Sequence, residues 1–299
     1  MNILMTGGTG FIGSNLVQQF IANGDHVYIM TRRRMTISHS KQVTYLNFNH
    51  PVEQLQPIDV VINLAGESLF GYWTKAKKQR ILLSRLTVTE KLLELIKQLP
   101  VKPKVFISAS AVGFYGTNSN TIFTERTTTP GNDFLAFVTS EWEKIAKRAE
   151  NLNIRTVLTR FGIVLDKHAG SFPLMSLPFK LFVGGKIGKG HQWLSWIHID
   201  DCIRLIQFAI RTDHMSGPLN VTAPNPLRNR DVTKIIGSTL QRPTFFTVPE
   251  KIVTCTLGEM SLLVTRGQYV YPKKAIEHKF TFHYPYLSLA LQQIFAKYK

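Results

Sequence analysis

The first half of the chain alternates between apolar runs of strand length and segments with a helical spacing of apolar residues. The runs at 2–6, 26–30, 43–48, 58–66, 104–110 and 154–161 predict six strands, and the segments at 11–23, 74–98 and 133–151 predict helices. The strands lack the polar alternation of a half-exposed sheet, so we expect them to be buried on both faces. The pattern predicts an α/β fold, a Rossmann-type doubly wound parallel sheet with helices on both faces.

This alternation is lost after about residue 165. Residues 168–193 are rich in Gly, Pro and aromatic side chains, 196–210 read as a strand that runs into a helix, and the segments 230–240, 258–265 and 286–295 have helical spacing. We therefore predict two domains. Residues 1–165 form the larger, nucleotide-binding domain, to which part of 191–225 returns, and 166–299 form a smaller, mostly helical lobe.

The composition is that of a globular protein, with 44% hydrophobic and 18% charged residues. No apolar stretch is long enough to span a bilayer, and the first residues, MNILMTGGTG, lack the basic and apolar regions of a secretory signal. Cys202 and Cys255 have no metal-binding or redox spacing, which predicts reduced, buried thiols. These features favour a cytoplasmic protein with no membrane partner.

The charge balance is strongly basic. Lys and Arg number 36 and Asp and Glu number 19, which gives a formal net charge of +17. Such a field attracts polyanions, phosphates and acidic membranes. The basic residues are spread along the chain, however, and no basic tail, zinc finger or RNA-binding motif accompanies them. We therefore expect a solvated basic surface and an anionic cofactor, and no nucleic acid partner.

The segment MTGGTGFIGSNL places three glycines between the first predicted strand and the first predicted helix. Gly7 permits the tight turn, Gly10 lets the backbone approach a pyrophosphate, and Gly13 lets the helix pack closely on the strand. Phe11 and Ile12 open the helix, whose free N–H groups and dipole favour phosphate. The segment therefore predicts a dinucleotide site.

The residues after the second predicted strand indicate which dinucleotide binds. NAD-binding proteins usually carry Asp or Glu there to hold the 2′-hydroxyl of the ribose, whereas this chain has Arg32, Arg33 and Arg34. Arginine pairs with a 2′-phosphate through its fork of donors. We therefore predict NADP(H) as the cofactor, held by Arg32 and Arg33. The alternative is that these arginines are solvated surface residues.

Two motifs, TGGTGFIG and NLAG at 63–66, resemble the extended short-chain dehydrogenase/reductase superfamily. Further segments narrow the resemblance to the epimerase family proteins, also named NAD-dependent epimerase/dehydratase-like or cell-division-inhibitor-like. These segments are ISASAVGFYG, DFLAFVTSEWE, RFGIVL, GGKIGKGHQWLSWIHIDD and NVTAPNP. The similarity covers essentially the whole chain. It implies a Rossmann-type fold with a small C-terminal lobe and an NADP(H) site, and it names no substrate.

The resemblance also implies further cofactor contacts. Leu64, Ala65 and Gly66 would line the adenosine side of the cofactor. Ser108 would lie near the end of the fifth strand beside the nicotinamide, and Arg160 would end the sixth strand near the same ring.

The same resemblance reveals that a catalytic pair is missing. In the superfamily a tyrosine transfers the proton, and a lysine one helical turn later lowers its pKa and holds the ribose, with a glutamate four residues further on. Aligning Glu143 with that glutamate puts Leu135 at the tyrosine position and Thr139 at the lysine position. Leucine transfers no proton and threonine carries no charge, so the superfamily's usual mechanism is excluded.

Three residues are candidates for the missing proton donor, each with a structural alternative. Ser110 can bond a substrate oxygen or cap its strand, and Tyr115 can supply a phenol or pack in a turn. Glu67 can act as a general acid or base if desolvation raises its pKa, or it can be a charge at a helix N-terminus. Tyr72 and Trp73 can wall the substrate pocket or pack in the core.

Two later segments offer weaker signals. His198 in WIHIDD resembles an architectural residue of extended relatives more than a base, and its neighbours make no zinc signature, so we predict no metal. GGKIGKG lacks the Gly-Lys-Ser/Thr end of a P-loop. We expect it to cover the substrate opening, with Lys186 and Lys189 placed to meet an anionic group.

These observations support an NADP(H)-dependent oxidoreductase or epimerase that acts on a small-molecule substrate with an altered proton donor. The alternative is a non-catalytic NADP(H)-binding sensor or scaffold, which would bind the cofactor without turnover. A third hypothesis is a nucleic-acid-binding protein driven by the +17 charge, whose binding would fall steeply with salt. Many members of the superfamily are dimers, so an oligomer is compatible with each of these three hypotheses.

Overall fold

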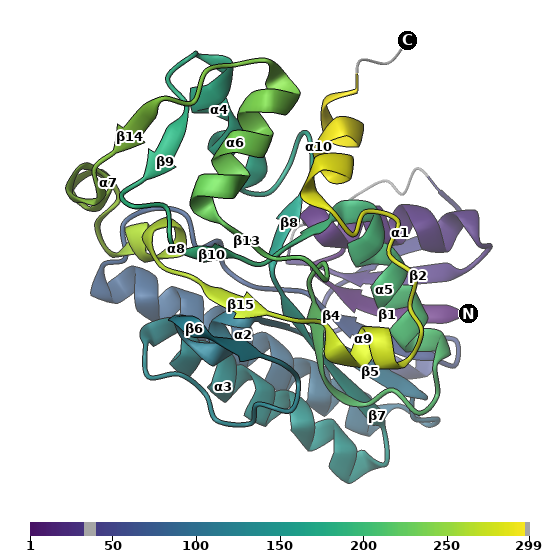
Figure 1. Cartoon of the computed structure of the whole chain (residues 1–299). Coiled ribbons are helices and arrows are strands. Elements are labelled where there is room, and N and C mark those ends of the chain that lie inside the picture. Colours follow the sequence, from purple (N-terminus) through teal and green to yellow (C-terminus); the bar gives the residue numbers. More distant parts are fainter. Residues whose placement is uncertain (33–39, 297–299) are drawn as a thin grey trace.

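The structure is a computed structural model that describes residues 1–32 and 40–296. Its centre is a seven-stranded parallel sheet in the order β12-β7-β5-β4-β1-β2-β3 (Figure 1). The strands are β1 (Asn2–Thr6), β2 (His26–Met30), β3 (Val43–Leu46), β4 (Val60–Asn63), β5 (Val105–Ala111), β7 (Arg155–Phe161) and β12 (Gly217–Val221). The predicted doubly wound parallel sheet is confirmed.

Side chains of each central strand alternate between two cores, one on each face of the sheet. Ile3 and Met5 pack with α1 (Phe11–Ala22) and α5 (Ile199–Arg211) on one face. Leu4 packs on the other face with α2 (Lys75–Gln98) and with Ala146, the last residue of α3 (Phe134–Ala146). This two-sided burial explains why the strands are continuous apolar runs in the sequence.

The rest of the chain builds a smaller lobe at one side of the carboxyl ends of these strands (Figure 1). Its strands form two-stranded pairs: β8 (Ile163–Leu165) with β11 (Trp196–His198), β9 (Gly185–Ile187) with β14 (Phe246–Val248), β10 (Trp193–Leu194) with β13 (Leu227–Arg228), and β15 (Gln268–Val270) with β6 (Asn118–Phe123). Its helices are α4 (Phe172–Lys180), α6 (Asn229–Leu240), α7 (Glu250–Leu257), α8 (Leu262–Thr265) and α10 (Leu287–Phe295). The short helix α9 (Lys273–Glu277) returns to the central sheet, where Ala275 shares a core with Leu219 of β12. A third core joins α4, α6 and α10. The predicted domain limits remain a prediction.

Short 3₁₀ turns connect several elements: η1 (Val52–Gln54), η2 (Val112–Tyr115), η3 (Lys147–Leu152) and η4 (Gly258–Ser261). The helix predicted at 133–151 is α3 followed by η3, because the tighter turn replaces its last part. Side chains cap the N-termini of α2 and α3. Thr74 accepts a hydrogen bond from the Lys77 amide at the start of α2, and Asp133 accepts one from Ala136 at the start of α3.

The two cysteines differ in burial. Cys202 is buried in α5, as predicted, and burial raises the pKa of its thiol. The prediction of a buried Cys255 is wrong, because this residue lies on the exposed side of α7, a helix that buries only Val253. Among the described residues, no helix has the length and apolar character needed to cross a membrane.

Candidate functional site

The order of the sheet reverses at β1, which lies between β2 and β4. In open α/β sheets, ligands bind at such a point, outside the carboxyl ends of the strands. Gly7 has a φ of 71°, and a Cβ there would lie 2.7 Å from the carbonyl carbon of Leu64 and 2.9 Å from the Ala65 amide. The turn after β1 and the loop after β4 are therefore packed backbone against backbone, which brings Gly7, Leu64 and Ala65 together.

The other two glycines shape the entrance to α1. A Cβ on Gly13 would lie 2.1 Å from the Gly7 carbonyl oxygen, so only glycine lets the helix approach this closely. Gly10 donates its amide to the same oxygen at 2.9 Å and precedes the helix without a side-chain cap. Phe11 and Ile12 are half-buried at its first turn. This end of α1 therefore has amide donors that no side chain occupies.

Replacing Gly13 by Ala should abolish tight binding of a dinucleotide and destabilise the fold by about 1–3 kcal/mol or more, because the new Cβ forces helix and turn apart. Urea unfolding and cofactor titration would measure the two effects. Ser14→Ala, one residue further along the helix, is the control and should change neither appreciably. Unchanged binding in the Gly13 variant would contradict a ligand at this turn.

A buried polar chain holds the loop after β4 in place. The Thr6 hydroxyl donates to Asn63 Oδ1 at 2.7 Å, and Asn63 Nδ2 donates to the Thr89 hydroxyl at 2.8 Å. The Trp142 indole N–H also donates to that hydroxyl at 2.8 Å. Ser108 is fully buried beside Asn63. Three strands and two helices are thereby fixed around one edge of the site, since each of these polar atoms has a partner.

Arg32 and Glu67 lie on the exposed rim of the site. Arg32 follows β2 and is exposed, and its charge acts on the Glu67 carboxylate. A hydrogen bond from Lys77 at 2.8 Å, together with the Lys77 charge, lowers the pKa of Glu67. The expectation that desolvation could raise this pKa is wrong, because the ion pair outweighs the burial. Arg33 lies outside the described residues.

The structure brings one residue to the site that the sequence analysis did not single out. Arg85 of α2 donates to the carbonyl oxygens of Ile81 at 2.8 Å and Glu67 at 3.1 Å. Its guanidinium carbon would lie 3.1 Å from a Cβ on Gly66, directly behind the loop after β4. Burial lowers the pKa of Arg85 to about 10. Arg85 is half-buried, and no carboxylate in the described part of the chain forms an ion pair with it, so this cation retains unused donors.

The position of Arg85 bears on the missing lysine. Its guanidinium carbon lies 5.3 Å from the centre of the Trp142 ring on α3. Thr139, which occupies the lysine position, is buried one helical turn before Trp142, where its hydroxyl bonds the Leu135 carbonyl. Arg85 of α2 therefore places a positive charge against α3, next to the turn where the superfamily has a lysine and this chain has Thr139. The sequence did carry a signal for this role. Arg85 lies four residues from both Ile81 and Thr89, so helical spacing places its charge on the buried stripe of α2.

Ser110, Glu143 and Arg160 form a buried cluster at the end of β5. The Ser110 hydroxyl donates to Glu143 Oε1 at 2.6 Å, and Arg160 binds both oxygens of the same carboxylate at 2.7 and 2.8 Å. Burial alone would lower the pKa of Arg160, but the hydrogen bonds and charge of Glu143 raise it. The Arg160 side chain, 1% exposed, is therefore committed to an internal ion pair.

Tyr115 is also engaged inside the protein. Its hydroxyl donates to Asn220 Oδ1 at 2.7 Å, and the Arg160 guanidinium lies 4.8 Å from the centre of its ring. Burial raises the pKa of Tyr115 to about 12. Near neutral pH this phenol stays protonated and bonded to Asn220.

The tyrosine position of the superfamily is apolar in three dimensions as well as in sequence. Leu135 packs against a cluster that includes Trp73, Ile81 and Val138. The Trp73 indole N–H donates to the Leu69 carbonyl, and Tyr72 is exposed with its hydroxyl on the Thr256 carbonyl. Trp73 is thus a core residue, and neither aromatic brings a free polar group to Leu135.

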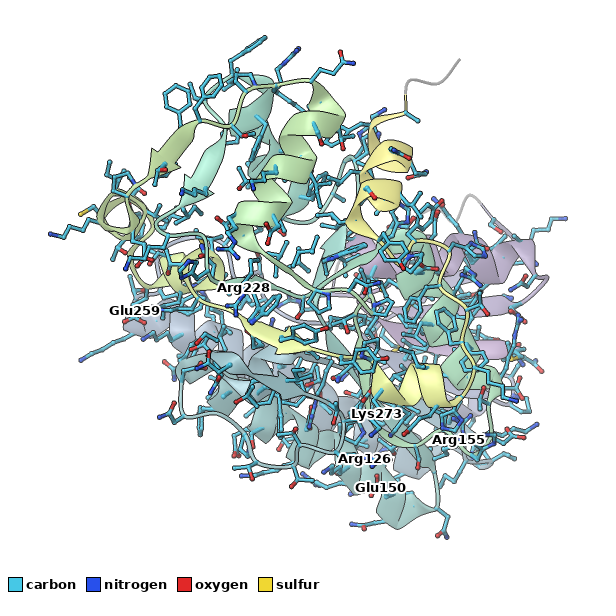
Figure 2. All side chains as sticks on the ribbon, viewed as in Figure 1. Arg126, Glu150, Arg155, Arg228, Glu259 and Lys273 are labelled. Carbon is cyan, nitrogen blue, oxygen red and sulfur yellow. The ribbon has the colours of Figure 1, made fainter. Side chains whose placement is uncertain are left out.

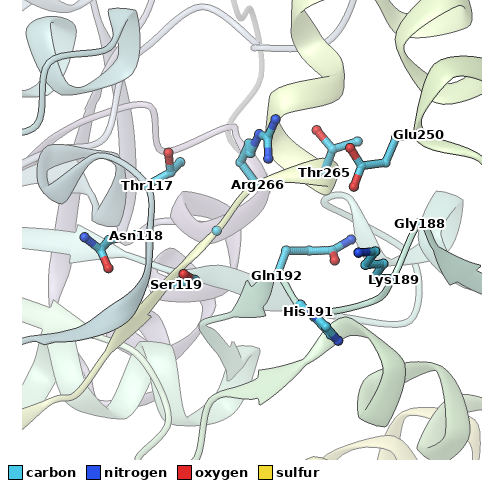
Figure 3. A pocket seen from close by; sticks show the side chains of 11 residues that line it. Thr117, Asn118, Ser119, Gly188, Lys189, His191, Gln192, Glu250, Thr265 and Arg266 are labelled. Atoms are coloured by element: carbon cyan, nitrogen blue, oxygen red, sulfur yellow. The ribbon is translucent and has the colours of Figure 1, made fainter.

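A polar cavity of about 740 Å³ lies between the small lobe and the segment after η2 (Figure 3). Lys189, His191 and Arg266 line it, and Glu250 is its single carboxylate among the described residues. Its other lining residues are Thr117, Asn118, Ser119, Gly188, Gln192, Thr265 and Gly267. The GGKIGKG segment therefore contributes Lys189 to the wall, whereas Lys186 is not part of it.

Arg228 braces the same region from β13. Its guanidinium donates to the Ser119 carbonyl at 3.0 Å and lies 3.8 Å from the centre of the Trp193 ring. The contact ties the small lobe to the segment that lines the cavity.

His198 joins two helices. Its Nδ1 accepts a hydrogen bond from the Asp200 amide at the start of α5, and its Nε2 lies 2.9 Å from the Gln293 amide oxygen on α10. Burial lowers the pKa of His198, which keeps the ring neutral. Within the described ranges, no group of three or more His, Cys, Asp or Glu side chains could hold a metal ion.

Residues 3–221 match the NAD dependent epimerase/dehydratase family, and residues 248–294 match a domain of unknown function. The chain belongs to the NAD-dependent epimerase/dehydratase family. It is 46% identical to the epimerase family protein YfhF of Bacillus subtilis over 100% of this chain and 99% of the relative, and 42% identical to the epimerase family protein SSP1921 of Staphylococcus saprophyticus over 97% and 98%. The resemblance inferred from the sequence motifs is confirmed.

Two solved structures have the same architecture. The crystal structure of the human epimerase family protein SDR39U1 with NADPH superposes with a TM-score of 0.89 and 30% identity over 98% of this chain and 99% of the human one. UDP-glucuronic acid 4-epimerase from Bacillus cereus, solved with UDP-glucuronic acid and NAD, has a TM-score of 0.76 at 20% identity over 97% and 96%. The second match shows likeness of fold alone.

Proposed function

We propose that this epimerase family protein binds NADP(H) at the switch point of its sheet. The observation that carries the proposal is the backbone cradle in which Gly7 and Gly13 meet the loop at Leu64 and Ala65, with Arg32 on its rim. The free amides of α1 suit a pyrophosphate, and Arg32 with Arg33 suits a 2′-phosphate. The NADPH in the human relative supports the same assignment.

Arg85 would hold the nicotinamide ribose of the cofactor, because it packs on Trp142 of α3, one turn after Thr139 at the superfamily's lysine position. Its spare donors lie behind Gly66, and ribose hydroxyls or a phosphate would use them. The role assigned in the superfamily to a lysine on α3 would then belong to an arginine on α2. When bound, the cofactor would supply the hydride, and the residues of the protein would orient its ring and exclude water.

The proposed reaction is hydride transfer to or from a small anionic molecule, as an oxidoreductase or epimerase. The cavity lined by Lys189, His191 and Arg266 fits a polar substrate with negative charge. Among the candidate catalytic residues, Ser110 retains oxygen lone pairs that can orient a substrate hydroxyl. Tyr115 and Glu67 stay protonated and ionised, respectively, near neutral pH, which limits both as proton carriers.

Replacing Arg32 and Arg33 together by Ala should lower the affinity for NADPH about tenfold or more and leave that for NADH nearly unchanged, because only NADPH carries the 2′-phosphate. Isothermal titration with both cofactors would measure the ratio. Arg148→Ala removes an exposed arginine on η3 and serves as the control. An unchanged NADPH/NADH ratio in the double variant would refute the assignment of the 2′-phosphate.

One observation favours the alternative of a sensor or scaffold that binds NADP(H) without turnover. The three candidate proton donors each have an internal partner: Ser110 bonds Glu143, Tyr115 bonds Asn220, and Glu67 bonds Lys77. NADPH deuterated at C4 decides between the two functions. Deuterium that appears in a carbonyl substrate establishes catalysis, whereas tight binding with no transfer across a broad set of carbonyl compounds favours the sensor.

A further inference from the structure

The end of the small lobe farthest from the central sheet carries a concentration of exposed apolar side chains. We call it the lobe tip, and its elements are α4, the turn that follows it, β9 and β14 (Figure 1). Its exposed residues are Leu174 (58%), Leu177 (46%), Leu181 (62%), Phe182 (55%), Val183 (53%), Phe245 (84%) and Phe246 (50%). Contiguous exposed apolar surface of this kind marks an interaction site.

Backbone contacts bring the two segments of the lobe tip together. Leu181, Phe182 and Val183 donate their amides to carbonyls in the last turns of α4, so the turn folds onto the helix end. Phe246 pairs with Gly185 in the β9–β14 ladder. The Arg242 guanidinium lies 4.2 Å from the centre of the Phe182 ring, which joins the turn to the segment before β14. The apolar residues therefore form one surface.

The backbone holds this surface outward. Leu174, Leu177 and Leu181 follow helical spacing on the exposed face of α4, while Phe172 and Phe179 of the same helix are buried in the third core. Phe182 has a φ of 64°, a left-handed conformation that is uncommon for a bulky residue. The side chains of this part of the small lobe extend freely from the ribbon (Figure 2).

The two segments that build the lobe tip carry charge of one sign. Residues 167–199 and 232–249 contain Lys167, Lys180, Lys186, Lys189, Lys234 and Arg242 and no Asp or Glu. These cations belong to a chain whose formal net charge is +17. The partner of this surface must therefore offer an apolar phase together with negative charge.

We propose that the lobe tip docks on the surface of an anionic phospholipid bilayer. Apolar side chains enter the interface between headgroups and acyl chains, while Lys180, Lys186 and Arg242 meet the lipid phosphates. This is attachment to a surface, which needs no membrane-spanning helix. It departs from the expectation of no membrane partner, which depended on the lack of an apolar stretch long enough to span a bilayer.

A second copy of the chain fits this surface less well. A twofold interface places the same patch on both subunits, so it would set Lys180, Lys186 and Arg242 of one copy against the same cations of the other. Neither segment supplies a carboxylate to neutralise them. Charge complementarity therefore favours an anionic lipid surface over self-association.

Flotation of the full-length protein with vesicles tests the proposal. Vesicles of phosphatidylglycerol with phosphatidylcholine should carry the protein at about 0.1 M salt, and pure phosphatidylcholine vesicles should not. Leu181→Ser with Phe245→Ser should lower the partition coefficient about tenfold or more. Lys180→Gln, Lys186→Gln and Arg242→Gln together should lower it about 10- to 100-fold.

A matched control keeps the test specific. Val101→Ser with Ile122→Ser removes two side chains, 60% and 61% exposed, outside the lobe tip, and should leave partition unchanged. Urea unfolding confirms that each variant is folded. The proposal fails if wild-type protein does not float with the anionic vesicles, or if the Leu181 and Phe245 variant floats as wild type does. It also fails if the protein does not bind vesicles and instead self-associates through the lobe tip. Sedimentation velocity would then show an oligomer for the wild type and a monomer for the Leu181 and Phe245 variant.

Discussion

Arg85→Ala should weaken NADPH binding about 10- to 100-fold while leaving adenosine 2′,5′-bisphosphate binding within about twofold of wild type. Hydrogen bonds that involve a charged group contribute about 1.5–3 kcal/mol each. The bisphosphate carries the adenosine and its 2′-phosphate and lacks the nicotinamide ribose, so it reports on the Arg32 side of the site alone. Isothermal titration of both ligands separates the two ends of the cofactor.

Two controls accompany this measurement. Arg80→Ala removes an exposed positive charge from the same helix and should weaken NADPH binding about twofold at most, because the interaction is screened by solvent. Thr139→Lys, added to Arg85→Ala, returns a cation to the superfamily's lysine position and should recover part of the lost affinity. If both ligands lose affinity equally, Arg85 acts only by supporting the loop at Gly66. If wild type binds neither ligand, the proposed cofactor itself is wrong.

Glu143→Ala should lower the free energy of unfolding by about 3–5 kcal/mol, because it leaves the Arg160 guanidinium buried without its carboxylate. Glu143 is 3% exposed and accepts two bonds from Arg160 and one from Ser110. Urea unfolding would measure the change. Glu141→Ala, which breaks the more exposed pair with Lys144 on the same helix, should cost about 1 kcal/mol or less.

A double variant tests the cause of this loss. Glu143→Leu with Arg160→Met removes both charges and keeps most of the volume, so it should recover much of the stability lost in Glu143→Ala. A double variant as unstable as the single one would show that packing around Phe114 and Tyr115, over which the guanidinium lies, contributes more than the charge pair.

Much of the large domain could be predicted because its elements have local signals. The strand at Asn2–Thr6 and the one at His26–Met30 match their predicted limits, since continuous apolar runs between turns have few alternatives. The helix expected to reach 151 gives way to η3 after Ala146. The pairs of short strands in the small lobe were not predicted, because two- and three-residue strands depend on partners that are distant in sequence.

The site was predictable where backbone geometry governs it. The glycine spacing predicted the turn between β1 and α1, because a tight turn followed by a closely packed helix requires glycine at positions 7, 10 and 13. The candidate proton donors were less accessible to sequence analysis. The pKa of Glu67 depends on Lys77, which lies 10 positions further along the chain. The pKa of Tyr115 depends on its burial beside Arg160, 45 positions away on another element.

The amino-acid sequence by itself determined the doubly wound sheet, the dinucleotide turn, the basic residues after β2 and the loss of the tyrosine and lysine on α3. These are matters of residue type and short-range spacing, so local sterics and periodicity decide them. Only the tertiary structure decided that Arg85 lies behind Gly66, that Ser110 and Tyr115 have internal partners, and that distant apolar residues meet at the lobe tip. Each depends on which side chains from separate elements come within contact, and packing of the whole chain determines that.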